Sequence, residues 1–311
     1  MLQELKKSIE QIDVKGKRVA VQIPEGLKQY ADLIIDALRD KGAKTIFLFI
    51  DPNFGACDLK DRETKDLRAD ILLHFGHNRF KRITETKVPV IYLPITLDLN
   101  VEKILDALER IEGKIALCTT VQYLPHLKRL KKALGDKIVI GRGVLATENG
   151  QVLGCDPGAC NVEADVNVII TDGIFHGVLA RMQTGRKTYI LTPAGELIDV
   201  EPHVEQYLRQ RETAKILARD AKRVGVVITT KRGQMYREVA EEVARRIRES
   251  GVDADLLVCD YFYPEYVEGM PYDAYVFTGC PRVPIDDYTR FKKPILTVAE
   301  AMEVWKRDTG R

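Results

Sequence analysis

Short apolar runs and amphipathic stretches alternate along this chain, and the alternation occurs three times in the same order. Runs rich in Val, Ile and Leu are typical of parallel strands covered on both faces, and the stretches between them are typical of crossover helices. We predict first strands at 18–24, 114–120 and 223–229, second strands at 44–51, 137–141 and 254–260, third strands at 69–76, 166–173 and 273–279, and fourth strands at 87–94, 187–193 and 292–298.

The helices expected after the first strands support this alignment. In the first repeat, six apolar residues at intervals of three and four would share one helical face, namely Leu27, Tyr30, Ala31, Ile34, Ile35 and Leu38. In the third repeat, Val239, Val243 and Ile247 have the same spacing. Gly42 and Gly251 are the expected ends of the two helices, because glycine readily adopts the left-handed conformation that closes a helix.

The pattern therefore predicts an α/β protein of three pseudo-equivalent lobes, each a four-stranded parallel sheet flanked by helices. We expect lobe boundaries near 1–97, 98–200 and 201–311, with a helix over 203–223 leading from the second lobe into the third. No linker rich in Pro, Gly or Ser separates the lobes. In open α/β sheets the ligand-binding loops follow the carboxyl ends of the strands, so the residues there are the candidates for function.

Composition narrows the classes of function. The 48 basic and 46 acidic residues leave a formal charge of +2, which provides no net field for nucleic acid or an anionic membrane. The first residues lack the apolar core of a signal peptide, and no run of about 18 apolar residues occurs. We expect a cytoplasmic protein, in which six cysteines would be reduced and available for burial, metal binding or catalysis.

The six cysteines fall into two groups by position. Cys118 and Cys259 lie inside apolar strands, where a free cysteine is usually a core residue. The others lie in predicted loops at strand ends: Cys57 and Cys155 after second strands, Cys160 five residues later, and Cys280 directly after a third strand. Each lobe thus has at least one loop cysteine, and an Asn-Gly pair before Cys155 suggests a short hairpin.

Loop cysteines in all three lobes are compatible with one convergent thiolate site, and spacing alone leaves incidental cysteines as the alternative. Gly55, Gly154 and Gly279 beside them would let the backbone approach a bulky cluster. No C-x-x-C motif is present, and Cys155 with Cys160 lacks the second pair or histidines that a zinc tetrahedron needs. A structural zinc site is therefore not expected.

Two other motifs are weak. Residues 141–146, GRGVLA, match a dinucleotide fingerprint, but a turn and not a helix is predicted after them, so no helix N-terminus is available for a pyrophosphate. His74 and His77 are three residues apart at a strand end without a third ligand nearby, which favours core or substrate-edge histidines over metal ligands. No P-loop and no G-x-S-x-G nucleophile elbow occurs.

Five segments, in order along nearly the whole chain, resemble the archaeal diphthamide-biosynthesis enzymes, which are 3-amino-3-carboxypropyl transferases. The segments are IPEGL at 23–27, FGACD at 54–58, GQVLGC at 150–155, DGIFH at 172–176 and TGCPRVPID at 278–286. The resemblance implies a homodimer of three-lobed subunits around a central 4Fe-4S cluster held by one cysteine per lobe. Carried over motif by motif, these ligands are Cys57, Cys155 and Cys280.

The resemblance also implies a reaction. Such enzymes cleave S-adenosylmethionine between sulfur and the γ-carbon, and the resulting 3-amino-3-carboxypropyl radical modifies a histidine imidazole of translation elongation factor 2, the first step of diphthamide biosynthesis. Three thiolates on four irons leave one iron without a protein ligand, which agrees with that chemistry because the open position can bind the substrate. Cys160 is the alternative to Cys155, which we prefer because Cys155 lies in the matched motif.

The hypothesis also includes contacts with S-adenosylmethionine, two partners and two alternative functions. Loops at Pro24-Glu25-Gly26, Asp172-Gly173 and Gly233-Gln234 end strands that should face the cluster and would contact S-adenosylmethionine, unless they only terminate strands. An electron donor is required, and elongation factor 2 would dock at the same edge. The alternatives are a quinolinate synthase-like 4Fe-4S dehydratase, whose cysteine surroundings differ from these, and a non-catalytic subunit that binds a partner protein.

Overall fold

A computed structural model describes residues 2–306 of the chain, and these residues form three sheets in two compact units. The first unit, Met1–Glu201, contains two of the sheets, and the second, Pro202–Arg311, contains the third. Within the described residues, no helix has both the length and the apolar character needed to span a membrane. The division into three lobes ending at 97 and 200 stays a prediction.

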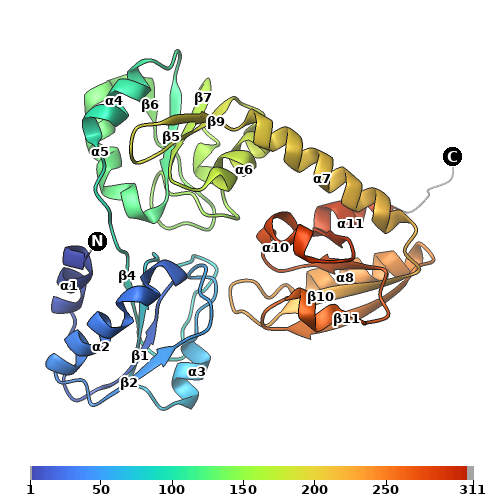
Figure 1. Ribbon diagram of the computed structural model, residues 1–311, viewed down its shortest axis with the longest axis horizontal. Helices are drawn as coiled ribbons and strands as arrows, with labels where there is room; N and C mark the ends of the chain where they lie inside the picture. The colour runs from blue at the N-terminus through green and yellow to red at the C-terminus, as the bar shows by residue number, and fades with distance from the viewer. Residues whose placement is uncertain (1, 307–311) are drawn as a thin grey trace. The chain divides into compact units, whose positions relative to one another are not determined.

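The first sheet has the strand order β2-β1-β3-β4, and all its pairs are parallel. Its strands are β1 (Arg18–Gln22), β2 (Thr45–Phe49), β3 (Ile71–Phe75) and β4 (Val90–Leu93). Helices α1 (Leu2–Glu10) and α2 (Ala31–Asp40) cover one face, and α3 (Asp61–Asp66) lies on the other (Figure 1). The predicted first helix begins as a 3₁₀ turn, Glu25–Tyr30, before α2, and Gly42 closes it with φ of 80°.

The second sheet repeats this order and adds one strand. Its order is β6-β5-β7-β8-β9, formed by β5 (Ile115–Thr119), β6 (Ile138–Val139), β7 (Val166–Ile170), β8 (Thr188–Leu191) and β9 (Leu197–Asp199). The helices are α4 (Val101–Glu109), α5 (Leu124–Leu134) and α6 (Ile174–Thr184), with 3₁₀ turns at Val121–Tyr123, Gly135–Lys137 and Gly158–Cys160. Strand β9 is antiparallel to β8, so the prediction of four strands was wrong for this lobe. Gly195, with φ of 92°, forms the turn that returns the chain.

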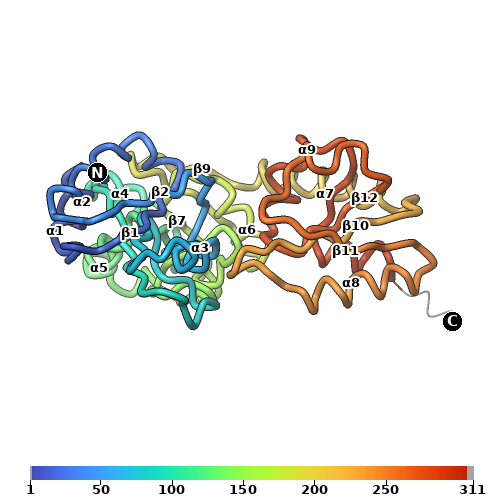
Figure 2. Tube along the Cα trace, turned by 90° about the horizontal axis from the view of Figure 1, so that it is seen from below, coloured from blue at the N-terminus to red at the C-terminus, as the bar shows by residue number. Residues whose placement is uncertain are grey.

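The third sheet has the order β11-β10-β12-β13 with parallel pairs throughout. The strands are β10 (Arg223–Thr229), β11 (Asp253–Cys259), β12 (Ala274–Phe277) and β13 (Ile295–Leu296). The helices are α7 (Glu201–Arg219), α8 (Arg237–Glu249), α9 (Pro264–Val267), α10 (Arg282–Asp286) and α11 (Val298–Val304), with a 3₁₀ turn at Tyr288–Arg290. Figure 2 shows α8 and α9 on opposite sides of this sheet.

The predicted fold class is confirmed, because the strand predicted as first in each repeat is paired on both sides by the second and the third. The predicted helix before the third lobe is α7. In α8 the apolar face is rotated from the predicted one. Val243 and Ile247 are buried as expected, but Val239 is 39% exposed and Ala240 takes its place in the core.

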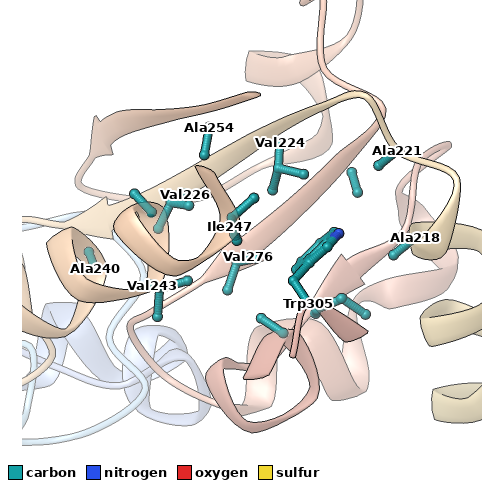
Figure 3. Packing of buried hydrophobic residues seen from close by; sticks show 14 of the residues in the cluster. Ala218, Ala221, Val224, Val226, Ala240, Val243, Ile247, Ala254, Val276 and Trp305 are labelled. Carbon is teal, nitrogen blue, oxygen red and sulfur yellow. The ribbon is translucent and has the colours of Figure 1, made fainter. Parts of the chain in front are cut away.

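The core on one face of the third sheet is built around Trp305. Buried residues of α7, α8 and α11 pack there against β10 and β12, and Figure 3 shows the indole directed into the cluster. The residues on the strand side include Val224, Val226 and Val276. Because Trp305 is the single tryptophan of the chain, its fluorescence reports on the folding of this unit alone.

A buried ion pair fixes α7 to the third sheet. Arg211 on α7 donates to both carboxylate oxygens of Glu300 on α11, at 2.7 and 2.6 Å, and to the carbonyls of Pro284 and Ile295 at 2.5 and 2.7 Å. Burial by itself raises the pKa of Glu300, but the bonds from Arg211 and Thr297 outweigh it and hold that pKa below its ordinary value. The guanidinium thus satisfies acceptors from three segments.

We expect Arg211→Met to lower the free energy of unfolding of the second unit by about 3–5 kcal/mol, because Glu300 would remain buried without its partner. Urea unfolding of the full chain followed by Trp305 fluorescence measures the change. Arg209→Met, an exposed position on the same helix, is the control and should change little. Equal effects of the two substitutions would contradict this role of Arg211.

Candidate functional site

Cys57 lies in a tight turn beyond the carboxyl end of β2. The turn spans Gly55 to Asp58 and is closed by the Asp58 amide, which donates to the Gly55 carbonyl at 3.0 Å. The Gly55 amide donates in turn to Oδ1 of Asn53 at 3.1 Å. Asn53 is 1% exposed, and its Nδ2 has no acceptor among residues 2–306. The half-buried Cys57 thiol therefore belongs to a loop with an unused buried N–H donor.

Gln22 ties this loop to the sheet. It is the last residue of β1 and is buried, and its Nε2 donates to the Asp58 carbonyl at 2.6 Å while its Oε1 accepts from the Lys60 amide at 3.3 Å. A single side chain thus holds the backbone on the far side of Cys57. Gln22 was not among the predicted site residues, although a glutamine inside a buried apolar strand is itself a signal of a buried hydrogen-bonding role.

Cys155 also lies in a tight turn. Leu153 and Asp156 exchange both backbone hydrogen bonds, at 3.0 and 3.1 Å, so Gly154 and Cys155 are the two turn residues. The predicted hairpin turn at Asn149-Gly150 was wrong. Arg142 and Asn149 form an antiparallel β-bridge, and the residues between them form the loop. No helix follows 141–146, in agreement with the rejection of a dinucleotide site.

The Asp156 carboxylate organises the segment around Cys155. Oδ2 accepts from the Leu145 and Ala146 amides at 2.5 and 3.2 Å, and Oδ1 accepts from the Gly158 amide at 3.0 Å. Side chains at Gly143 or Gly158 would come within 2.7 Å of these oxygens, so both glycines are needed for the close approach. One buried carboxylate therefore connects three parts of the loop.

The two cysteine segments meet within the first unit. Phe80 forms a bridge with Ala146, Lys81 donates through its amide to the Leu145 carbonyl at 3.0 Å, and Asn78 donates to Oε1 of Gln151 at 3.3 Å. Cys57 packs against an apolar cluster whose neighbours include Leu153. The structure thus brings together the regions of Cys57 and Cys155, which are about 100 residues apart in sequence.

The other two cysteines of the first unit contact each other in the core. Cys118 and Cys160 are both fully buried, and their sulfurs are 3.2 Å apart. The hydrogen bond to Cys160, together with burial, raises the pKa of the Cys118 thiol well above its ordinary value. Cys118 is thus a core residue as predicted, and Cys160 shares that core instead of lying beside the Cys155 thiol in the loop.

The second unit contains two half-buried cysteines. Cys280 follows β12, and its carbonyl accepts from the Val283 amide at 3.1 Å as α10 begins. Burial raises the pKa of the Cys280 thiol, while the amide and guanidinium of Arg282 act in the opposite direction. The expectation that Cys259 is a core residue was wrong. It ends the edge strand β11 and lies half-buried against the same aromatic cluster as Cys280.

The surroundings of Cys259 and Gly279 explain the state of the thiol and the need for the glycine. Burial and Asp260 raise the pKa of the Cys259 thiol to about 11, which keeps it protonated. At Gly279, a side chain would collide with Thr229 and with the Phe277 ring. The glycine is therefore explained by packing at the end of β12.

The loop predicted to bind S-adenosylmethionine after β1 follows the carboxyl end of that strand. Pro24 begins the 3₁₀ turn, its ring packs where a Gly76 side chain would lie, and its carbonyl accepts from the Leu27 amide at 2.9 Å. Glu25 is exposed and pairs with Lys28 at 2.7 Å, and Gly26 is exposed. These contacts are those of a turn that ends strand β1.

The other two loops also end strands. Asp172 accepts from the Tyr123 hydroxyl at 3.1 Å, and the Gly173 amide donates to Oγ1 of Thr171 at 3.2 Å at the start of α6. In the second unit Gly233 is buried, and the Gln234 amide donates to the Lys231 carbonyl at 2.9 Å. Contact of any of these residues with a ligand stays a prediction.

Neither unit alone contains, among its described residues, three or more His, Cys, Asp or Glu side chains arranged to hold a metal ion. A cavity of about 340 Å³ in the first unit is lined by Arg181, Lys187, Asp199 and Glu201. These charges pair with one another, Arg181 with Glu201 and Lys187 with Asp199, so they are already neutralised. The turns of the loop cysteines therefore remain the candidate site.

We expect Asp156→Asn to loosen the Cys155 turn by about 1–3 kcal/mol, because an amide cannot accept all three backbone N–H bonds. Hydrogen exchange with mass analysis should show faster exchange over 145–158. Asp165→Asn, which alters one exposed carboxylate that accepts from the Lys114 amide, is the control. Unchanged exchange in Asp156→Asn would show that the carboxylate does not hold the turn.

Comparisons with known proteins cover nearly the whole chain. The sequence profile of the family described as "Putative diphthamide synthesis protein" matches residues 23–310. The 2-(3-amino-3-carboxypropyl)histidine synthase of Pyrococcus horikoshii is 34% identical in an alignment of 309 residues that covers 96% of this chain and 87% of that protein. The enzyme of the same name from Methanocaldococcus jannaschii is 28% identical, over 94% of this chain and 86% of its own.

A solved structure agrees with the sequence comparisons. The crystal structure of Dph2 from Pyrococcus horikoshii with a 4Fe-4S cluster superimposes with a TM-score of 0.88 at 32% identity, covering 99% of this chain and 92% of that one. Similarity of this extent includes all three sheets and the loops that contain the cysteines. The chain belongs to the diphthamide synthesis protein family.

Proposed function

We propose that this protein is a 2-(3-amino-3-carboxypropyl)histidine synthase that transfers the 3-amino-3-carboxypropyl group of S-adenosylmethionine to a histidine of translation elongation factor 2. The observation that carries the proposal is the match of fold and sequence to enzymes of that name over almost the entire chain. Family membership favours this activity over quinolinate synthase-like chemistry and over a non-catalytic subunit.

We also propose that Cys57, Cys155 and Cys280 hold a 4Fe-4S cluster, since the related Dph2 of Pyrococcus horikoshii was crystallised with one. When bound, the cluster supplies the electron that cleaves the bond between sulfur and the γ-carbon. The thiols of Cys57 and Cys155 lie in tight turns and are half-buried, whereas Cys160 is buried against Cys118. The buried Nδ2 of Asn53 fits such a site as a donor available to a thiolate or sulfide, which supports the assignment of Cys57.

The protein's own residues would fix the ligands. Gln22 and Asn53 restrain the Cys57 turn and Asp156 restrains the Cys155 turn, so two sulfurs would be presented with little freedom. Loops at Pro24-Glu25-Gly26, Asp172-Gly173 and Gly233-Gln234 are proposed contacts of S-adenosylmethionine. A homodimer, an external electron donor and a cytoplasmic location complete the proposal.

The cysteine assignment predicts which single substitutions abolish the cluster. Cys57→Ala, Cys155→Ala and Cys280→Ala should each lose most of the iron and the visible absorbance after anaerobic reconstitution, because only three protein ligands are available. Cys118→Ala, Cys160→Ala and Cys259→Ala are matched controls and should keep both. Retention in Cys155→Ala with loss in Cys160→Ala, or the same exchange between Cys280 and Cys259, would reassign the ligand.

The reaction itself is tested by anaerobic incubation of reconstituted protein with dithionite, S-adenosylmethionine and elongation factor 2. Mass measurement of the factor should show the gain of one aminocarboxypropyl group, located on a histidine by peptide analysis, together with formation of methylthioadenosine. Omission of dithionite is the control. An unmodified factor in the presence of an intact, reducible cluster would refute the proposed substrate.

A further inference from the structure

A chain of hydrogen bonds leads from the loop after Cys57 to His77. It begins at Gln22, whose Nε2 donates to the Asp58 carbonyl and whose Oε1 accepts from the Lys60 amide. Because a carbonyl can only accept and an amide N–H can only donate, these two bonds fix the orientation of the Gln22 amide. Its Oε1 is therefore an acceptor for any third partner.

The third partner is His74, whose Nδ1 lies 3.0 Å from Oε1 of Gln22. Nδ1 must carry the proton of this bond. Burial and the neighbouring His77 lower the pKa of His74 well below its ordinary value, so the ring is neutral and its Nε2 has a lone pair. Nδ1 of His77 is 3.2 Å from that Nε2 and consequently donates to it.

This sequence of donors and acceptors determines the tautomer of His77. Burial lowers the pKa of His77 to about 4, against a smaller opposite effect of the Phe75 carbonyl, so this ring is neutral as well. With its proton on Nδ1, the ring presents an unprotonated Nε2. Apart from the contact of the ring with the backbone of Phe75, we find no further hydrogen bond of the His77 ring in the part of the chain that the structure describes, and His77 is only half-buried.

His77 is connected through its neighbours to both cysteine segments of the first unit. The network reaches the backbone of Asp58 and Lys60 on one side. On the other side, the next residue, Asn78, donates to Gln151, and Phe80 bridges Ala146 on the way to Cys155. The lone pair is thus held at the carboxyl edge of β3 by a chain of hydrogen bonds that begins at the buried Gln22 and His74, as expected for a preorganised binding group.

We propose that His77 is a substrate-binding residue whose Nε2 accepts a hydrogen bond from an N–H donor of the substrate. This inference rests on the proposed function. Two groups of that reaction have the required chemistry: the α-ammonium group of S-adenosylmethionine and the imidazole N–H of the target histidine. A fixed acceptor would orient either group relative to the position where the new carbon–carbon bond forms.

Two substitutions at this position separate binding from a purely structural role. His77→Asn keeps an amide donor where Nδ1 donates to His74 but lacks an acceptor at the place of Nε2. His77→Gln places an amide oxygen or nitrogen near the place of Nε2 and is the conservative variant. His203→Asn on α7, an exposed position, is the matched control.

The experiment uses the full chain with its reconstituted cluster, unreduced so that no turnover occurs. Dissociation constants are measured separately for S-adenosylmethionine and for elongation factor 2, and the visible spectrum of each variant is recorded. We expect His77→Asn to weaken one of the two affinities about tenfold or more. The spectrum should be unchanged, and His77→Gln should recover part of the loss. The ligand whose affinity falls is the one that supplies the N–H donor to His77.

Three results would contradict the proposed role of His77. Wild-type affinity of His77→Asn for both ligands would overturn the inference while leaving the proposed function intact, provided that wild-type protein transfers the group. Loss of the cluster spectrum in His77→Asn would overturn it as well, because His77 would then support the cluster. Failure of wild-type protein to bind either ligand would refute the proposed function and this inference together.

Discussion

Parallel pairing of β1, β5 and β10 on both sides is the constraint from which the rest of this structure follows. A strand with two parallel neighbours has its backbone groups occupied, and both its faces are covered by crossover helices. Apolar residues therefore fill most positions of the strands, and the loops with the candidate cysteines follow their carboxyl ends. Gln22 is the clearest case. It occupies the last position of β1, where a buried amide can bond to a neighbouring loop and to a neighbouring strand at once.

The parallel pairing of the central strands also determines what each cysteine sulfur contacts. Cys118 lies in a central strand and can contact only core residues, and the nearby Cys160 turns inward to meet it. Cys57 and Cys155 lie in turns that hydrogen bonds from Asn53, Gln22 and Asp156 hold in place. Two kinds of thiol thus arise from one residue type, because burial against apolar atoms disfavours the thiolate that metal binding requires.

The buried polar side chains of Arg211, Gln22 and His74 each belong to a connected set of hydrogen bonds. Each set links elements that are distant in sequence, and the residues in it are held with little freedom. In the second unit, Arg211 does this with the carbonyls of Pro284 and Ile295 and the carboxylate of Glu300. In the first unit, the chain from Gln22 to His77 does it with neutral groups, and Asn78, the residue after its last member, bonds to Gln151 near Cys155.

The α/β class, the threefold repeat, all strands except β9 and the loops in which Cys57, Cys155 and Cys280 lie could be predicted from the amino-acid pattern, because apolar periodicity and turn residues are local signals. The folded chain was needed to show that Cys160 contacts Cys118, 42 residues away, and that Gln22 bonds to His74, 52 residues away. It also showed that Cys259 is half-buried and that β9 adds an antiparallel edge. Contacts between distant side chains leave no local pattern. The protonation of His77 depends on the orientation of Gln22, which is fixed by backbone groups of Asp58 and Lys60, and on the bond from Gln22 to His74, so it could be assigned only from the folded chain.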